Sequence, residues 1–115
     1  MMGLIVDAHL QRGTALAAVL RTLGHRPIPV VKTALDAIPW IADVKLDFIV
    51  VAPVWASERT AYVLRSECND RGFDPILVCV APHRDVKPGG FDSYLTHPFL
   101  LDQLDQALRD GRRTN

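Results

Sequence analysis

Short apolar runs alternate with longer amphipathic segments along the whole chain. Helical spacing of apolar positions predicts helices over residues 11–23, from residue 34, over residues 57–71 and between residues 99 and 110. Apolar and β-branched runs predict strands at residues 3–6, 28–31, 48–51, 75–80 and 93–96. This alternation is typical of β-α-β units. It predicts a three-layer α/β/α sandwich with a parallel, flavodoxin-like sheet of order 2-1-3-4-5.

Local signals refine these elements. Pro27 and Pro29 predict that the second strand lies at a sheet edge, because a missing N–H costs little there. Thr33 and Ser57 are the expected N-caps of the second and third helices, and Pro39 should kink the second helix or delay its start. The side chains expected to face the core are Leu16, Val19, Leu20 and Leu23, then Leu35, Ile38 and Ile41, then Tyr62, Val63 and Leu64, and finally Leu101, Leu104 and Leu108.

The segment between the fourth and fifth strands has no helical period. Pro82, Pro88, Gly89 and Gly90 fall within it, so we expect a loop or a single turn. Such a segment could expose the neighbouring sheet edge to a partner or could cover that edge itself.

Composition limits the range of functions. With 115 residues, 13 basic and 13 acidic side chains, the chain suits one domain over residues 1–110 and a flexible tail at 111–115. Balanced charge argues against nucleic acid binding, and no apolar run is long enough for a bilayer, so we expect a cytoplasmic protein without a membrane partner. Cys68 and Cys79 are expected to be free thiols.

Four segments together resemble a bacterial response-regulator receiver domain of the CheY-like superfamily. They are residues 4–7 (Leu-Ile-Val-Asp), 47–51 (Asp-Phe-Ile-Val-Val), 75–78 (Pro-Ile-Leu-Val) and 94–99 (Tyr-Leu-Thr-His-Pro-Phe), and they span nearly the whole chain. The resemblance implies a module of two-component signalling and phosphorelay rather than an enzyme.

The positions that carry the chemistry of this family depart from its pattern. The resemblance places Asp7 and Ala8 at the acidic pair and Ala52 at the phosphoacceptor aspartate, whose carboxylates together hold Mg²⁺ in the family. Val80 stands where a hydroxyl residue is usual, and His97 stands where a lysine is usual. We therefore expect a degenerate pseudo-receiver with a vestigial phosphorylation pocket, no cofactor and no metal.

Histidines near this pocket leave two alternatives open. His97 could pair with Asp7 and titrate near neutral pH, or it could only satisfy a buried carboxylate by hydrogen bonding. His9 together with Asp7 and His97 has the donor types of a weak metal site, although solvent-facing loop histidines are the commoner case.

Two aromatic side chains are candidate switch or contact residues. The resemblance places Tyr94 at the aromatic position whose side chain moves inward in the family when the hydroxyl residue is drawn toward the phosphate. Because Val80 has no hydroxyl, this coupling is absent, and Tyr94 is either placed for a partner or a simple strand aromatic. Trp55 follows Ala52 and could cover the emptied pocket or form a contact patch. Only sixteen residues separate Val80 from His97, so the resemblance implies that the family's fourth helix is shortened or lost.

The predicted function is therefore a phosphorylation-independent receiver-like module that binds a protein: a kinase, a regulator or a second copy of itself. The alternative is a small-ligand domain of the cobalamin-binding type, since Asp7-Ala8-His9 followed by Gly13 misses the Asp-x-His-x-x-Gly spacing of that family by one residue. A hydrolase or redox enzyme lacks its signature motifs here.

Overall fold

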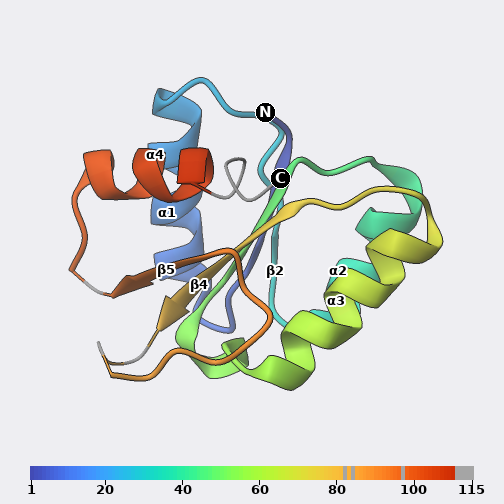
Figure 1. Ribbon diagram of the computed structural model, residues 1–115. Coiled ribbons are helices and arrows are strands. Elements are labelled where there is room, and N and C mark those ends of the chain that lie inside the picture. The colour runs from blue at the N-terminus through green and yellow to red at the C-terminus, as the bar shows by residue number, and fades with distance from the viewer. Residues whose placement is uncertain (82, 84, 97, 111–115) are drawn as a thin grey trace.

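A five-stranded parallel sheet of order β2-β1-β3-β4-β5 forms the centre of the molecule, as predicted (Figure 1). The computed structural model describes residues 1–81, 83, 85–96 and 98–110. In chain order the elements are β1 (Gly3–Val6), α1 (Leu10–Thr22), β2 (Val30–Val31), α2 (Ala34–Asp43), β3 (Phe48–Val51), the 3₁₀ turn η1 (Pro53–Trp55), α3 (Glu58–Asp70), β4 (Ile76–Ala81), β5 (Ser93–Thr96) and α4 (Leu101–Asp110).

Helices cover both faces of the sheet, which explains why the central strands are apolar throughout. Helices α1 and α4 lie on one face, and α2 and α3 lie on the other (Figure 1). Alternate residues of each strand enter the two cores, so Leu4 packs toward α2 and α3 while Ile5 packs toward α1 and α4. No helix in the described part of the chain is long and apolar enough to cross a bilayer.

The helix starts follow the predicted capping chemistry. The hydroxyl of Thr33 accepts a hydrogen bond from the Asp36 main-chain N–H, and that of Ser57 accepts one from Thr60. Helix α2 begins directly after Thr33 and runs through Pro39, so the expectation of a delayed start was wrong.

The predicted inward faces of all four helices were partly wrong. Leu35 is 73% exposed and Tyr62 is 72% exposed. The stripes that do face the core are Ala34, Ala37 and Ile41 in α2, and Thr60, Ala61, Leu64 and Cys68 in α3. Small side chains in these stripes let the helices approach the sheet closely. The sequence pattern did not reveal these stripes, because the larger apolar residues beside them dominate it. Val19 and Leu101, also expected inside, are 36% and 44% exposed.

Strand β2 is shorter than predicted but lies at the predicted edge. Pro27 and Pro29 still accept hydrogen bonds from the N–H groups of Gly3 and Ile5 through their carbonyls. Because a proline has no N–H to donate, only Val30 and Val31 complete the pairing with β1.

The connection from β4 to β5 contains no helix among its described residues, as the prolines and glycines predicted. We call residues 85–92 the connecting segment. Its Gly90 has a φ of +90° and lies so close to α3 that a β-carbon there would come within 2.9 Å of the Ala61 Cβ. Glycine is therefore required at this turn both by conformation and by space.

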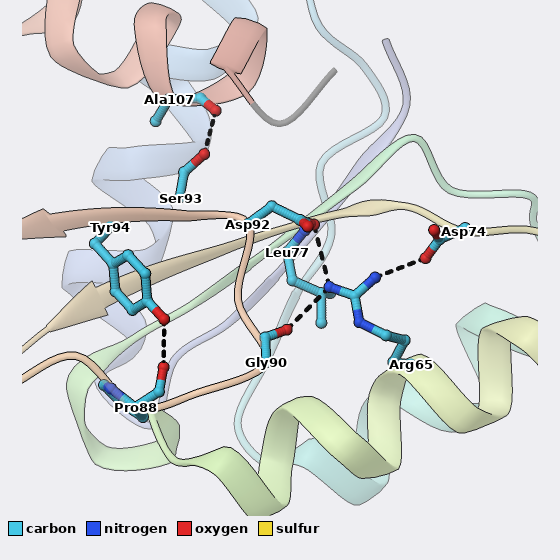
Figure 2. Close-up of polar contacts among 9 residues, drawn as sticks. All are labelled: Arg65, Asp74, Leu77, Pro88, Gly90, Asp92, Ser93, Tyr94 and Ala107. Atoms are coloured by element: carbon cyan, nitrogen blue, oxygen red, sulfur yellow. Dashed lines mark hydrogen bonds and ion pairs between the residues drawn. The ribbon is translucent and has the colours of Figure 1, made fainter. Parts of the chain in front are cut away.

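Arg65 of α3 ties this segment to the sheet (Figure 2). Its guanidinium donates to the Gly90 carbonyl at 2.9 Å and pairs with Asp74 at 2.6 Å and with Asp92 at 3.1 Å. Asp92 in turn accepts a hydrogen bond from the Leu77 N–H of β4. One side chain thus joins α3, the start of β4 and the end of the connecting segment.

Replacing Arg65 with methionine is expected to lower the free energy of unfolding by about 1.5 kcal/mol, because Asp92 and the Gly90 carbonyl lose a charged donor. Hydrogen exchange of the amides from Gly90 to Asp92 should also become faster. The matched control is Arg71→Met, which removes only a 3.7 Å surface pair with Glu67 and should change stability by less than about 0.5 kcal/mol. Equal effects of the two substitutions would contradict the tethering role of Arg65.

Candidate functional site

Three of the predicted pocket residues lie side by side at the carboxyl ends of adjacent strands. The strand register pairs Val6 with Val51 and Val51 with Cys79. The next residue of each strand is Asp7, Ala52 or Val80, so these three form a row across β1, β3 and β4. All three are at least 96% buried, whereas the neighbouring Ala8 is exposed.

Asp7 supplies the only carboxylate of this row, and α1 holds it firmly. The Arg12 guanidinium donates Nε–H to Oδ2 at 2.9 Å and Nη2–H to Oδ1 at 2.8 Å. The His9 main-chain N–H donates to Oδ1 at 2.8 Å. Such a bidentate arginine pair is among the stronger and more directional contacts available to a carboxylate.

This arrangement fixes the charge of Asp7. Burial of the carboxyl would by itself raise its pKa, but the Arg12 side chain, the His9 N–H and the charge of Arg12 together outweigh burial and hold the pKa below that of an ordinary aspartate. The same contact raises the pKa of Arg12. Asp7 is therefore an ionised, fully paired group at neutral pH.

The start of α1 explains why Asp7 and Arg12 meet. His9 is the N-cap, and its ring Nδ1 accepts the Arg12 main-chain N–H at 3.2 Å. At Gly13 an added β-carbon would lie 2.6 Å from Val30 Cγ1 and 3.3 Å from Asp7 Cβ, so glycine allows the helix to approach β1 and β2 closely. His9 and Gly13 thus have local structural roles, and the structure does not favour the cobalamin-type alternative.

The described residues do not fit a divalent metal. Asp7 already makes two hydrogen bonds to Arg12, and Ala8 and Ala52 provide no oxygen from their side chains. No group of three or more His, Cys, Asp and Glu side chains suited to a metal occurs in the described part of the chain. His97 lies outside the described residues, so its pairing with Asp7 and its share in a metal site stay predictions.

Trp55 has a different neighbourhood from the one expected for a cover over the pocket. Its indole N–H donates to the Lys32 carbonyl at 2.8 Å, and its ring packs against the core on the α2–α3 face. The contacts of Asp7, in contrast, lie at the start of α1. Trp55 therefore links the loop after β3 to the loop after β2.

Tyr94 is fixed against the connecting segment. Its hydroxyl donates to the Pro88 carbonyl (Figure 2). Its ring also makes an edge contact with Phe91, at 6.2 Å between the ring centroids. The Lys87 Nζ lies 6.0 Å from the ring centroid. Burial raises the pKa of the phenol, so the hydroxyl keeps its proton and remains a donor.

Both cysteines are buried and free, as predicted. Cys68 lies in α3 and Cys79 in β4. Burial raises the pKa of each thiol to about 11, which leaves them protonated and poorly nucleophilic at neutral pH.

Arg12 is a site residue that the sequence pattern did not predict. A signal was present, because Arg12 follows Asp7 by five residues and falls in the first turn of a helix that begins beside the strand. With that spacing, the Arg12 side chain reaches Asp7 at the end of β1 only if α1 starts at Leu10, one residue earlier than predicted.

Comparison with solved structures places this row of residues in context. A response-regulator receiver domain from Clostridium thermocellum superposes with a TM-score of 0.78 at 11% identity, covering 98% of this chain and 95% of that one. The receiver domain of the sensor histidine kinase PA1611 from Pseudomonas aeruginosa, which has a magnesium ion coordinated in its active site cleft, gives 0.73 at 22% identity, covering 94% and 93%.

A third structure shows a receiver domain with a bound partner. The receiver domain of the Saccharomyces cerevisiae response regulator Ssk1, in complex with the histidine phosphotransfer protein Ypd1, gives a TM-score of 0.75 at 20% identity and covers 94% of this chain and 86% of that one. This chain has the receiver fold. Its sequence matches no protein-family model and no curated protein.

Within the receiver fold, the row of Asp7, Ala52 and Val80 has one carboxylate, and an arginine of the same chain holds it. The PA1611 receiver domain coordinates magnesium in its cleft. Here the guanidinium of Arg12 is the cation that Asp7 contacts.

Proposed function

We propose that this chain is a receiver-like signalling module that works without aspartyl phosphorylation and acts by binding another protein. The observation that carries the proposal is the row of Asp7, Ala52 and Val80. It contains no nucleophilic carboxylate at the β3 end, and the carboxylate of β1 is paired with Arg12. The fold supports a role in two-component signalling.

The chemistry of the row supports the absence of phosphoryl transfer. Phosphoryl transfer to a receiver needs an attacking carboxylate and a cation that neutralises the developing charge. Ala52 has no attacking group, and the bidentate contact with Asp7 leaves Arg12 directed at that carboxylate. We infer that this edge holds one conformation instead of switching between two.

Partner binding is the remaining way for such a module to transmit a signal. Ssk1 binds its phosphotransfer protein through a receiver domain of this fold, and we propose a protein partner for this chain as well. A kinase, another regulator or a second copy are the candidates. We further propose that the protein acts in the cytoplasm and catalyses no reaction.

Incubation with Mg²⁺ and acetyl phosphate, a small phosphodonor, tests this proposal. Intact-mass spectrometry should show no phosphorylated species, with a conventional receiver domain as the positive control in the same reaction. A phosphorylated species that hydroxylamine cleaves would reveal an acyl phosphate and overturn the proposal.

A further inference from the structure

Strand β5 forms one edge of the sheet, and part of its main chain faces away from β4. The N–H of Asp92 donates to the Leu77 carbonyl at 2.8 Å, just before β5 begins. Ile76 donates its N–H to the Asp47 carbonyl on the β3 side, so Leu77, Cys79 and Ala81 turn their main-chain groups toward β5. The register, which pairs Cys79 with Tyr94, then directs the main-chain groups of Ser93 and Leu95 toward β4. Tyr94 and Thr96 turn theirs outward, and no described strand pairs with that side of β5.

A groove runs along this open edge. Two cavities of about 660 and 520 Å³ share Lys87, Tyr94, Leu95 and Gln103 in their linings. Helix α4 supplies one wall through Asp102 and Gln103, and the connecting segment supplies the other through Lys87. The outward main-chain groups of β5 lie between the walls, where an extended chain could add as a sixth strand.

The two walls carry opposite charges. Lys87 and Asp102 are both exposed, and neither has an ion-pair partner among the described residues. Side chains of an added strand point alternately to the two faces of the sheet. A carboxylate at one position would meet Lys87, and a cationic side chain at the adjacent position would meet Asp102.

The two ends of the groove also differ. Pro98 and Phe99 line the end near the carboxyl terminus of β5, whereas Asp92 lines the opposite end beside Arg65. A second copy that paired antiparallel through a two-fold axis would bring its charged end against the apolar end of the first. The groove therefore fits a segment of a different protein better than a second copy.

We propose that the β5 edge binds an extended segment of a partner protein as an added strand, and that this segment carries acidic and basic residues at adjacent positions next to an apolar residue. Lys87 and Asp102 select the charges, and the outward N–H and C=O groups of Tyr94 and Thr96 supply the main-chain hydrogen bonds. This site lies apart from Asp7 and does not depend on whether that edge is phosphorylated.

Titration with the capped peptide acetyl-Leu-Thr-Glu-Arg-Thr-Leu-amide tests the proposal by NMR. Binding should shift the Tyr94 and Thr96 amides and slow their hydrogen exchange, while Ser93 and Leu95, whose main chain faces β4, should change less. The neutral control peptide acetyl-Leu-Thr-Gln-Gln-Thr-Leu-amide should bind about tenfold more weakly, because it cannot form the ion pairs with Lys87 and Asp102.

Variants of the protein locate the binding site. Lys87→Glu and Asp102→Lys should each weaken binding of the charged peptide about tenfold, because each replaces an attraction with a repulsion. Lys45→Glu and Asp43→Lys, which change exposed charges at the α2–β3 connection, should leave binding unchanged. The proposal is overturned if no amide of β5 responds at about 1 mM peptide, or if the shifts map to another face. Protection of the Tyr94 and Thr96 amides that rises with protein concentration alone would assign the edge to a second copy and also overturn the proposal.

Discussion

Replacing Arg12 with methionine should destabilise the protein and reverse the pH dependence contributed by Asp7. Breaking a fully buried ion pair costs about 3–5 kcal/mol, and because the Arg12 side chain is 35% exposed we expect about 2 kcal/mol at pH 7. Methionine keeps most of the volume and the helix propensity of arginine, so the loss of stability reports mainly on the charge left behind. Chemical denaturation over a range of pH measures the effect.

The sign of the pH dependence follows from the pKa of Asp7. In the native protein this pKa lies below that of an unfolded aspartate, so the Asp7–Arg12 contact contributes stability above about pH 4 that disappears as the pH falls through the folded pKa. Without Arg12, burial dominates and raises the pKa of Asp7. The contribution of Asp7 to the free energy of unfolding should then decline as the pH rises above about 4.

Arg21→Met is the matched control for this experiment. Arg21 is exposed in the last turn of α1, and its replacement should change stability by less than about 0.5 kcal/mol at any pH. An Arg12→Met protein as stable as the native one, with the same pH profile, would show that Asp7 does not need Arg12. The role given to Arg12 at this edge would then be wrong.

Placing a carboxylate after β3 is expected to destabilise the protein and not to create a magnesium site. Ala52 is 4% exposed and follows β3 beside Asp7, so Ala52→Asp places two carboxylates on adjacent strands with one shared arginine. We expect stability to fall by about 3 kcal/mol at pH 7, because an added buried charge without its own partner is among the costliest substitutions.

Ala52→Asn separates charge from size in this second experiment. The amide of asparagine has nearly the shape of the aspartate carboxylate but no charge. The difference in free energy of unfolding between the two variants should therefore be large at pH 7. It should shrink as the pH falls, since protonation removes the repulsion. Addition of Mg²⁺ should not restore the stability of Ala52→Asp, because Ala8 supplies no further ligand and Arg12 holds Asp7. Recovery of native stability on adding Mg²⁺ would mean that two carboxylates suffice for a metal site here.

The features that sequence predicted best depend on local chemistry. Buried strands need continuous apolar runs, and Thr33 and Ser57 cap helices through their own hydroxyls, so these elements could be located without tertiary information. The strand order followed from the same alternation together with the resemblance. The glycines at 89 and 90 likewise predicted a turn instead of a helix after β4.

The features that sequence missed depend on how elements meet. Leu35 and Tyr62 are apolar yet exposed, because the sheet contacts the alanine-containing stripes beside them. The Arg65 tether joins residues nine to twenty-seven positions apart, and the Trp55 contact spans twenty-three. Arg12 was missed because an arginine in a first helical turn is usually solvated, and only the exact helix start brings it to Asp7.

We propose that the row of Asp7, Ala52 and Val80 takes no part in metal-dependent phosphoryl chemistry. NMR titration of the native protein with Mg²⁺ and then beryllofluoride, a phosphoryl mimic, tests it most directly through the amides of Asp7, His9 and Ala52. We predict no saturable shifts beyond those caused by sodium chloride of equal ionic strength. Saturable, magnesium-dependent shifts at Asp7 and Ala52 would contradict this claim.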